Sequence, residues 1–86
     1  MEDRLKDIET VGIGDIYVPV KRRKTLDPGR VDEIAESILE NGQQSPIWVR
    51  PDDKRLVLVE GLHRLEAMKA LGEETIQAIF VQARKG

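Results

Sequence analysis

One long segment of the chain carries apolar residues at the spacing of an amphipathic helix. Between Asp27 and Gly42, apolar side chains stand at positions i, i+3, i+4, i+7 and i+8, which places them along one helical face. Asp27 is suited to cap this helix, Pro28 to occupy its first position, and Gly42 to end it. The pattern therefore predicts a helix whose apolar face packs on a core, and that face comprises Val31, Ile34, Ala35, Ile38 and Leu39.

Four shorter segments are rich in β-branched and other apolar residues, which is typical of strands. The first, "DIYVPV" (15–20), follows a turn predicted by the glycines of "VGIGD", and its Pro19 favours a sheet edge or a strand end. "PIWVRP" (46–51) and "RLVLVEG" (55–61) are separated by the turn-like "DDK" and can form a hairpin. "TIQAIFVQ" (75–82) predicts a last strand.

A second helix is predicted from Leu62 to Leu71, and Gly72 is suited to end it. The expected order is therefore strand, helix, strand, strand, helix, strand. This order predicts a small α/β (α+β) fold with a mixed sheet and two main helices, forming one domain over residues 1–86 with its core at about 15–82. We expect Leu65, Met68 and Leu71 to contact that core, and Glu66 and Lys69 to lie outside it.

Composition and charge exclude several kinds of site. The 86 residues carry a formal net charge of −2, so the chain as a whole does not attract nucleic acid or an anionic membrane. One Trp, one Tyr and one Phe leave no aromatic platform for stacking single-stranded bases. The lack of Cys excludes disulfides and thiolate ligands, and a single His argues against a multi-histidine metal site. Any anion-binding surface must therefore come from local clustering of cations.

The sequence also predicts a location. No stretch approaches the roughly 20 apolar residues of a membrane span, and the N-terminus is charged from its second residue. We therefore expect a cytoplasmic protein that does not associate with a membrane, and the pattern gives no indication of its oligomeric state.

The junction "VEGLHR" places two potential cations where a helix disfavours them. His63 and Arg64 fall in a first turn, beside unpaired N–H groups and the positive end of the helix dipole. Gly61 allows a ligand to approach the backbone closely, Arg64 can bind phosphate oxygens bidentately, and His63 can donate a further bond. The junction is therefore a candidate phosphate site, but the same spacing also fits two solvated cations that pair with Glu60 or Glu66.

The first predicted helix repeats this arrangement, because Arg30 lies in its first turn, and two such N-termini suggest one shared anion. Ser37 lies further along the same face and can either donate a hydroxyl to a nucleotide or remain solvated. Glu33 can pair with Arg30, hold Mg²⁺ beside phosphates or act as a base. The cationic run from Lys21 to Lys24 predicts a basic loop that either binds the phosphates of a nucleotide or of a DNA backbone, or is simply solvated.

The motifs and their order resemble the ParB/sulfiredoxin-like domain over about Asp15 to Gln82. The likeness to ParB partition proteins lies in "RRK", in "ESILENGQQSPIWVRP" and in "GLHRLEAMKALG", which stands where those proteins have G-E-R-R-x-R-A. The G-x-H-R junction, "LDPGRV" and "ETIQAIFVQ" are similar to sulfiredoxin and the related free-serine kinases. The resemblance implies the fold of this superfamily for nearly the whole chain.

The resemblance also implies roles for individual residues. In ParB relatives the domain binds CTP, and the matching positions are Arg22, Arg23, Gly42, Gly61, His63 and Arg64, with His63 replacing the first arginine of the junction. In sulfiredoxin-like relatives the junction binds ATP or ADP phosphates, and the further matching positions are Arg30, Glu33 and Ser37. Leu62 stands at the catalytic cysteine of sulfiredoxin. Since leucine cannot attack a sulfinic phosphoryl ester, reductase activity is excluded.

The leading hypothesis is a module that binds CTP or ATP/ADP with Mg²⁺ and acts in plasmid, phage or chromosome maintenance or in DNA-linked regulation. A second hypothesis is an NTPase, phosphotransferase or nuclease that uses Glu33 or Glu60 as base or metal ligand. A third is a regulatory domain that binds a DNA backbone or a DNA-binding protein without any nucleotide. The predicted phosphate-binding residues are Arg22, Arg23, Lys24, Arg30, Ser37, Gly42, Gly61, His63 and Arg64.

Overall fold

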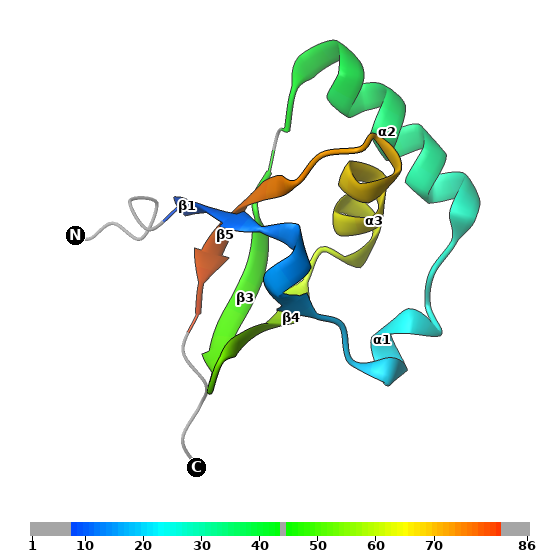
Figure 1. The fold of residues 1–86 in the computed structure, drawn as a ribbon. Helices are drawn as coiled ribbons and strands as arrows, with labels where there is room; N and C mark the ends of the chain where they lie inside the picture. Colours follow the sequence, from blue (N-terminus) through cyan, green and yellow to red (C-terminus); the bar gives the residue numbers. More distant parts are fainter. Residues whose placement is uncertain (1–7, 44, 82–86) are drawn as a thin grey trace, which may run out of the picture.

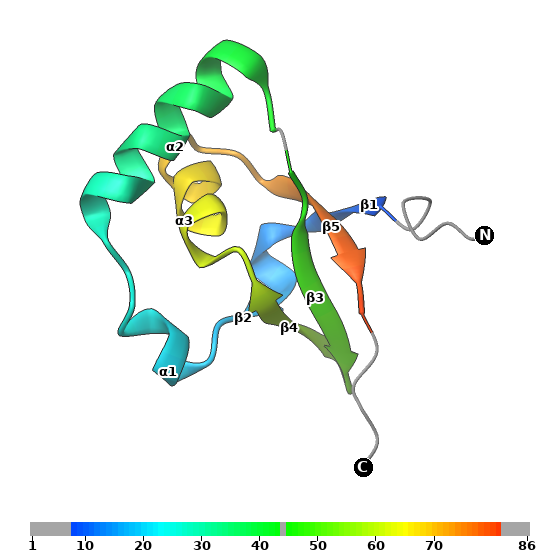
Figure 2. The same ribbon diagram turned by 180° about the vertical axis from the view of Figure 1, so that it is seen from behind.

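The computed structural model describes residues 8–43 and 45–81, which form a two-layer α+β domain. Five strands make a mixed sheet, and the helices lie together on one side of it in both ribbon views (Figures 1 and 2). The strands are β1 (Ile8–Gly12), β2 (Ile16–Tyr17), β3 (Ile47–Asp52), β4 (Arg55–Glu60) and β5 (Thr75–Phe80). The helices are α1 (Val20–Arg23), α2 (Pro28–Asn41) and α3 (Leu62–Ala70), and a 3-10 turn, η2, spans Ile13–Asp15. The expected fold class is confirmed.

The sheet has the strand order β1-β5-β3-β4-β2. β3 and β4 form the predicted antiparallel hairpin, and Asp53 in its turn has a φ of 58°, a conformation that Asp tolerates. β5 pairs parallel with β3 and antiparallel with β1, while β2 pairs parallel with β4. β2 therefore lies at a sheet edge, as Pro19 predicted.

Helix α2 begins and ends at the predicted residues. Asp27 caps it by accepting a hydrogen bond from the backbone N–H of Gly29 at 3.0 Å, and Gly42 ends it with a φ of 79°. Val31 is buried, and the other predicted core-facing residues are half-buried except Leu39, which is 72% exposed. The prediction that Leu39 packs on the core is wrong, because α2 packs mainly on the single helix α3 and its buried stripe is narrow.

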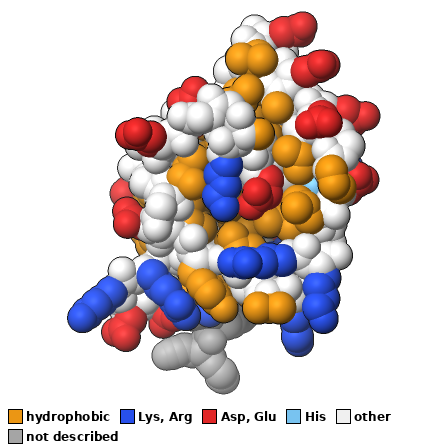
Figure 3. All heavy atoms as spheres, turned by 45° about the vertical axis from the view of Figure 1, so that its right-hand side comes forward, with side chains coloured by type: hydrophobic (Ala, Val, Ile, Leu, Met, Phe, Trp, Pro, Cys, Tyr) orange, Lys and Arg blue, Asp and Glu red, His pale blue; other side chains and the backbone are white. Residues whose placement is uncertain are grey.

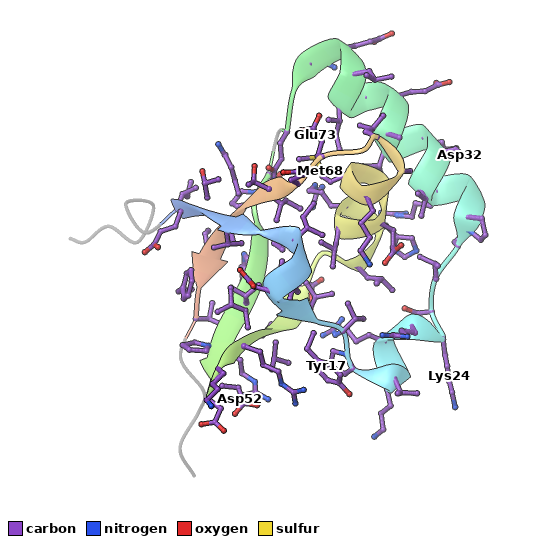
Figure 4. All side chains as sticks on the ribbon, viewed as in Figure 1. Tyr17, Lys24, Asp32, Asp52, Met68 and Glu73 are labelled. Atoms are coloured by element: carbon purple, nitrogen blue, oxygen red, sulfur yellow. The ribbon has the colours of Figure 1, made fainter. Side chains whose placement is uncertain are left out.

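Helix α3 lies between α2 and the sheet and supplies much of the core. Met68 extends from the side of α3 that faces the sheet (Figure 4), and it belongs to the buried cluster. In the described part of the chain, no helix is long and apolar enough to cross a membrane. The largest fully buried side chains join α3 to the central strands and are Ile47, Val49, Leu58, Leu65 and Ile76.

Strand β1 was not predicted. Residues 8–12 pair with β5, so the sheet includes residues before the expected core of 15–82. The predicted strand over 15–20 is reduced to the two residues of β2, because η2 precedes it and the chain enters α1 at Val20.

The basic run was predicted as a loop, and this prediction is wrong for most of it. Lys21 to Arg23 belong to the single turn of α1, and Lys24 is its C-cap. The backbone N–H groups of Arg22 and Arg23 donate to the carbonyl of Pro19 at 3.0 and 3.3 Å. Because the Pro19 ring fixes its φ, which is −58° here, this residue is suited to precede a helical turn.

Candidate functional site

A cleft of about 300 Å³ opens where α1, the beginning of α2 and the β4–α3 junction meet. α1 and its following segment contribute Arg22 and Thr25, and the first two turns of α2 contribute Arg30 and Ile34. The junction contributes the end of β4 and the first turn of α3. The complete lining is Arg22, Thr25, Arg30, Ile34, Glu60, Gly61, Leu62, His63 and Arg64.

Gly61 determines how β4 turns into α3. It precedes the helix in the left-handed conformation, with φ 108° and ψ 31°, and its carbonyl accepts the N–H of Leu65 at 2.9 Å. A Cβ at this position would lie 2.7 Å from Cγ2 of Ile47, which is fully buried in β3. The glycine is therefore required by the packing of the junction on the core, apart from any ligand.

Two helix N-termini face the cleft, and at α2 the capping carboxylate of Asp27 compensates part of the helix dipole. Neither α2 nor α3, both fully described, has an acidic residue in its first turn, and α3 has no side-chain cap. The unpaired N–H groups and the helix dipoles therefore favour an anion at this place. Since a cation in a first turn is repelled by the same dipole, Arg30 and Arg64 also favour an anion between the helices.

Three arginines supply the positive charge of the cleft. Arg22 Nη2 lies 4.0 Å from Glu60 Oε1, a long ion pair between side chains that are 40% and 68% exposed. Arg30 and Arg64 form no ion pair within residues 8–43 and 45–81. Among the described lining residues, Glu60 is the only acidic one. The cleft therefore has an excess of positive charge, although the whole chain is formally negative.

His63 connects the two helices. Its Nε2 accepts the backbone N–H of Asp27, the N-cap of α2, at 3.0 Å. Because the amide is the donor, Nε2 must be unprotonated in this arrangement. The bond joins residues 36 positions apart in the sequence and holds the start of α2 against the first turn of α3.

The structure brings together six of the residues predicted from the sequence. The cleft is lined by Arg22, Arg30, Glu60, Gly61, His63 and Arg64. Thr25 also lines the cleft and was not predicted. It directly follows the basic run in the sequence, and its hydroxyl donates to the Arg22 carbonyl at 2.8 Å. Leu62 is 5% exposed and joins the hydrophobic core, so it forms the apolar wall of the cleft.

Five predicted residues lie outside the cleft lining. Arg23 lies beside Val18 and Leu26 in a neighbouring groove, and Lys24 points away from the domain (Figure 4). The other three are exposed residues of α2 or its end, namely Glu33, Ser37 and Gly42, and Gly42 is at the far end of the helix from the cleft. Within the described residues, no three His, Asp or Glu side chains are grouped so as to hold a metal ion.

The distribution of charge can be followed on the molecular surface. Figure 3 shows acidic side chains mainly in the upper part of the helical face and Lys and Arg mainly in its lower part, with hydrophobic side chains between them. The basic part is therefore a local feature of one end of the domain.

The sequence matches a known family over almost its whole length. The family described as "ParB N-terminal domain" matches residues 2–85. A probable chromosome-partitioning protein ParB of Campylobacter jejuni is 42% identical over 62 residues, which are 72% of this chain. The chain spans 22% of the length of that relative.

Solved structures show the same fold. Sulfiredoxin from Arabidopsis thaliana has a TM-score of 0.79 and 32% identity, covering 88% of this chain and 85% of the sulfiredoxin. The C-terminally truncated chromosome-partitioning protein ParB from Caulobacter crescentus, complexed with CTP-gamma-S, has a TM-score of 0.78 and 23% identity. That match covers 91% of this chain and 46% of the ParB chain.

Proposed function

Since the chain belongs to the ParB N-terminal domain family, we propose that it binds a nucleoside triphosphate, CTP or ATP, in the cleft described above. We further propose that this binding serves the maintenance or DNA-linked regulation of a chromosome, plasmid or phage genome. One observation carries the proposal: three arginines from separate elements converge on one cleft at two helix N-termini. Phosphate groups are the ligands that such an arrangement favours.

The chemistry of the cleft fits a phosphate chain. Arg30 and Arg64 can each bind phosphate oxygens bidentately, and the backbone N–H groups of the first turn of α3 can donate to them. The volume of about 300 Å³ lies at the lower end of the range for ligand pockets, so it suits the phosphates better than a whole nucleotide. Ile34 and Leu62 offer an apolar wall.

Mg²⁺ would accompany the phosphates in this proposal. Glu60 is the described carboxylate that lines the cleft, and one carboxylate together with phosphate oxygens is a usual environment for this ion. Glu33 is outside the lining, so we assign it no part in holding the ion. When bound, Mg²⁺ would neutralise part of the phosphate charge.

Calorimetric titration with CTP, ATP and ADP, each with and without Mg²⁺, tests the proposal. We expect binding of at least one triphosphate, and a loss of about tenfold or more in affinity for Arg64→Ala and Arg22→Ala, because charge-assisted hydrogen bonds are lost. Arg23→Ala is the matched control, since it removes the same charge from the same turn but lies outside the cleft. It should change affinity less than about twofold at physiological salt.

Two results would contradict the proposal. One is the absence of binding for all three nucleotides. The other is equal weakening by Arg22→Ala and Arg23→Ala, which would indicate a diffuse charge effect without a defined site.

A phosphotransferase or nuclease is a second candidate function. Glu60 lines the cleft and Glu33 does not, so Glu60 is the better candidate for the general base of such an enzyme. A carboxylate beside bound phosphates can act as a general base. The protein is incubated with nucleotide or DNA in the presence of Mg²⁺ or Mn²⁺. Accumulation of a hydrolysed nucleotide, a phosphorylated product or cleaved DNA, and its loss in Glu60→Gln, would establish this candidate.

A further inference from the structure

The hydrogen bond between Asp27 and His63 does more than join two helices. Asp27 is the N-cap of α2, and three further backbone N–H groups depend on it. Its Oδ1 accepts the N–H of Gly29 at 3.0 Å, and its carbonyl accepts those of Arg30 and Val31 at 3.0 and 3.1 Å. The position of Asp27 therefore determines where α2 begins and where Arg30 stands.

His63 occupies the only polar contact described between this N-cap and α3. The Nε2 atom accepts the Asp27 N–H at 3.0 Å, so it has no proton to give to a phosphate oxygen in this arrangement. The proton of a neutral ring must then be on Nδ1. This differs from the role predicted from the sequence, in which His63 acts as one more donor at the junction.

We propose that His63 is a positioning residue: by accepting the Asp27 amide at Nε2, it aligns the N-terminus of α2 with that of α3 and so sets Arg30 and Arg64 across the cleft. The part that concerns ligand affinity rests on the proposed function. The hydrogen bond and the tautomer do not, because they belong to the protein without a ligand.

Two substitutions separate this role from that of a phosphate ligand. Glutamine places its amide oxygen the same number of bonds from Cα as Nε2, so His63→Gln retains an acceptor for the Asp27 N–H. Arginine has five donors and no acceptor, so His63→Arg supplies a cation but cannot make this bond. If His63 is a positioning residue, Gln should restore the nucleotide affinity that is lost in His63→Ala. If His63 binds phosphate, Arg should restore that affinity.

NMR of the protein without ligand tests the hydrogen bond directly. Correlation of ring protons with ring nitrogens should show the His63 proton on Nδ1. Exchange of the Asp27 amide should be roughly 3- to 10-fold faster in His63→Ala and His63→Arg, the range expected for one hydrogen bond, and close to normal in His63→Gln. The Ile13 amide, which donates to the Glu74 carbonyl at 2.9 Å away from the cleft, reports whether each variant is folded.

Titration of the same variants with CTP and ATP in the presence of Mg²⁺ tests the consequence for the cleft. We expect His63→Gln to retain affinity within about threefold, and His63→Ala and His63→Arg to lose more than that. The proposal is overturned by a proton on Nε2, by unchanged Asp27 exchange in a folded His63→Ala, or by tight binding in His63→Arg with weak binding in His63→Gln. If no nucleotide binds, the proposed function fails, while the tautomer and amide exchange still decide whether His63 positions α2.

Discussion

Gly61 occupies a place in which neither the backbone nor the space suits a side chain. We predict that Gly61→Ala destabilises the domain by about 2–5 kcal/mol, which combines the strain of a left-handed backbone with overpacking of the core. The added Cβ would lie 2.7 Å from Cγ2 and 3.0 Å from Cβ of Ile47, which is 0% exposed and has no room to move. Urea unfolding followed by circular dichroism measures the change.

Gly72→Ala is the matched control for this prediction. Gly72 also has a positive φ, of 80°, but a Cβ there would meet no atom within 4 Å. Its substitution should cost about 1–2 kcal/mol, from the backbone conformation alone. Equal losses for the two variants would show that the contact with Ile47 does not constrain the junction.

At the residue scale, the sequence predicted which residues form the β4–α3 junction, but not the tertiary contacts that require them there. The pattern of charges identified Gly61, His63 and Arg64 correctly as neighbours at a helix start, because that follows from local order along the chain. It could not show that Ile47 excludes a Cβ at Gly61, or that Asp27 is the partner of His63. Both contacts join residues far apart in the sequence, so they depend on the tertiary fold.

The side-chain amide of Gln43 links the end of α2 to β5 by bonding the backbone of β5 as a neighbouring strand would. Its Oε1 accepts the N–H of Gln77 at 2.9 Å, and its Nε2 donates to the carbonyls of Gln77 and Ser45 at 3.1 and 2.9 Å. The pairing of β3 with β5 begins only at Ile47 and Ala78, so this amide extends the sheet by one position. We predict that Gln43→Ala destabilises the domain by about 1–2 kcal/mol, since the lost bonds are partly exposed, and that it accelerates exchange of the Gln77 amide.

Gln77→Ala provides the comparison. The bonds to Gln43 use the backbone of Gln77, and its side chain is exposed, so truncation should cost less than about 0.5 kcal/mol. Chemical denaturation of both variants gives the difference. A cost for Gln77→Ala equal to that for Gln43→Ala would contradict the role assigned to the Gln43 amide.

At the element scale, the predictions succeeded where an element carries its own signals. α2 has a cap, a helical period and a terminating glycine, and the β3–β4 hairpin has a turn between two apolar runs. β1 was missed because its residues 8–12, "IETVG", do not alternate polar and apolar side chains, and because its partner β5 lies more than sixty residues later. α1 was missed because four residues are too few to show a helical period.

At the scale of the whole molecule, the net charge and the proposed site have opposite signs. The chain carries −2, yet the cleft gathers Arg22, Arg30 and Arg64 against one described carboxylate, Glu60. Anion binding of this kind must be a short-range effect, because charges beyond about 8 Å are largely screened at physiological salt. The position of a charge relative to the cleft should therefore affect nucleotide affinity more than its contribution to the net charge of the chain.

Substitution of Glu60 tests this inference. In titrations without Mg²⁺, Glu60→Gln should strengthen nucleotide binding by about 2- to 5-fold, because it removes the carboxylate that lies 4.0 Å from Arg22 and repels a phosphate, an effect comparable to that of a surface ion pair. Calorimetric titration with CTP or ATP at low and at physiological salt measures it, and the gain should shrink as salt increases.

Glu36→Gln makes the same change in net charge on an exposed position of α2 outside the cleft, so it should leave affinity within about 1.5-fold of the original. If both substitutions strengthen binding equally, the total charge of the domain governs association and the local arrangement of arginines does not. If Glu60→Gln weakens binding only in the presence of Mg²⁺, the carboxylate holds the cation beside the phosphates, and its repulsion of the ligand is the smaller effect. The comparison of these two glutamates therefore distinguishes long-range attraction, local repulsion and metal binding within one set of titrations.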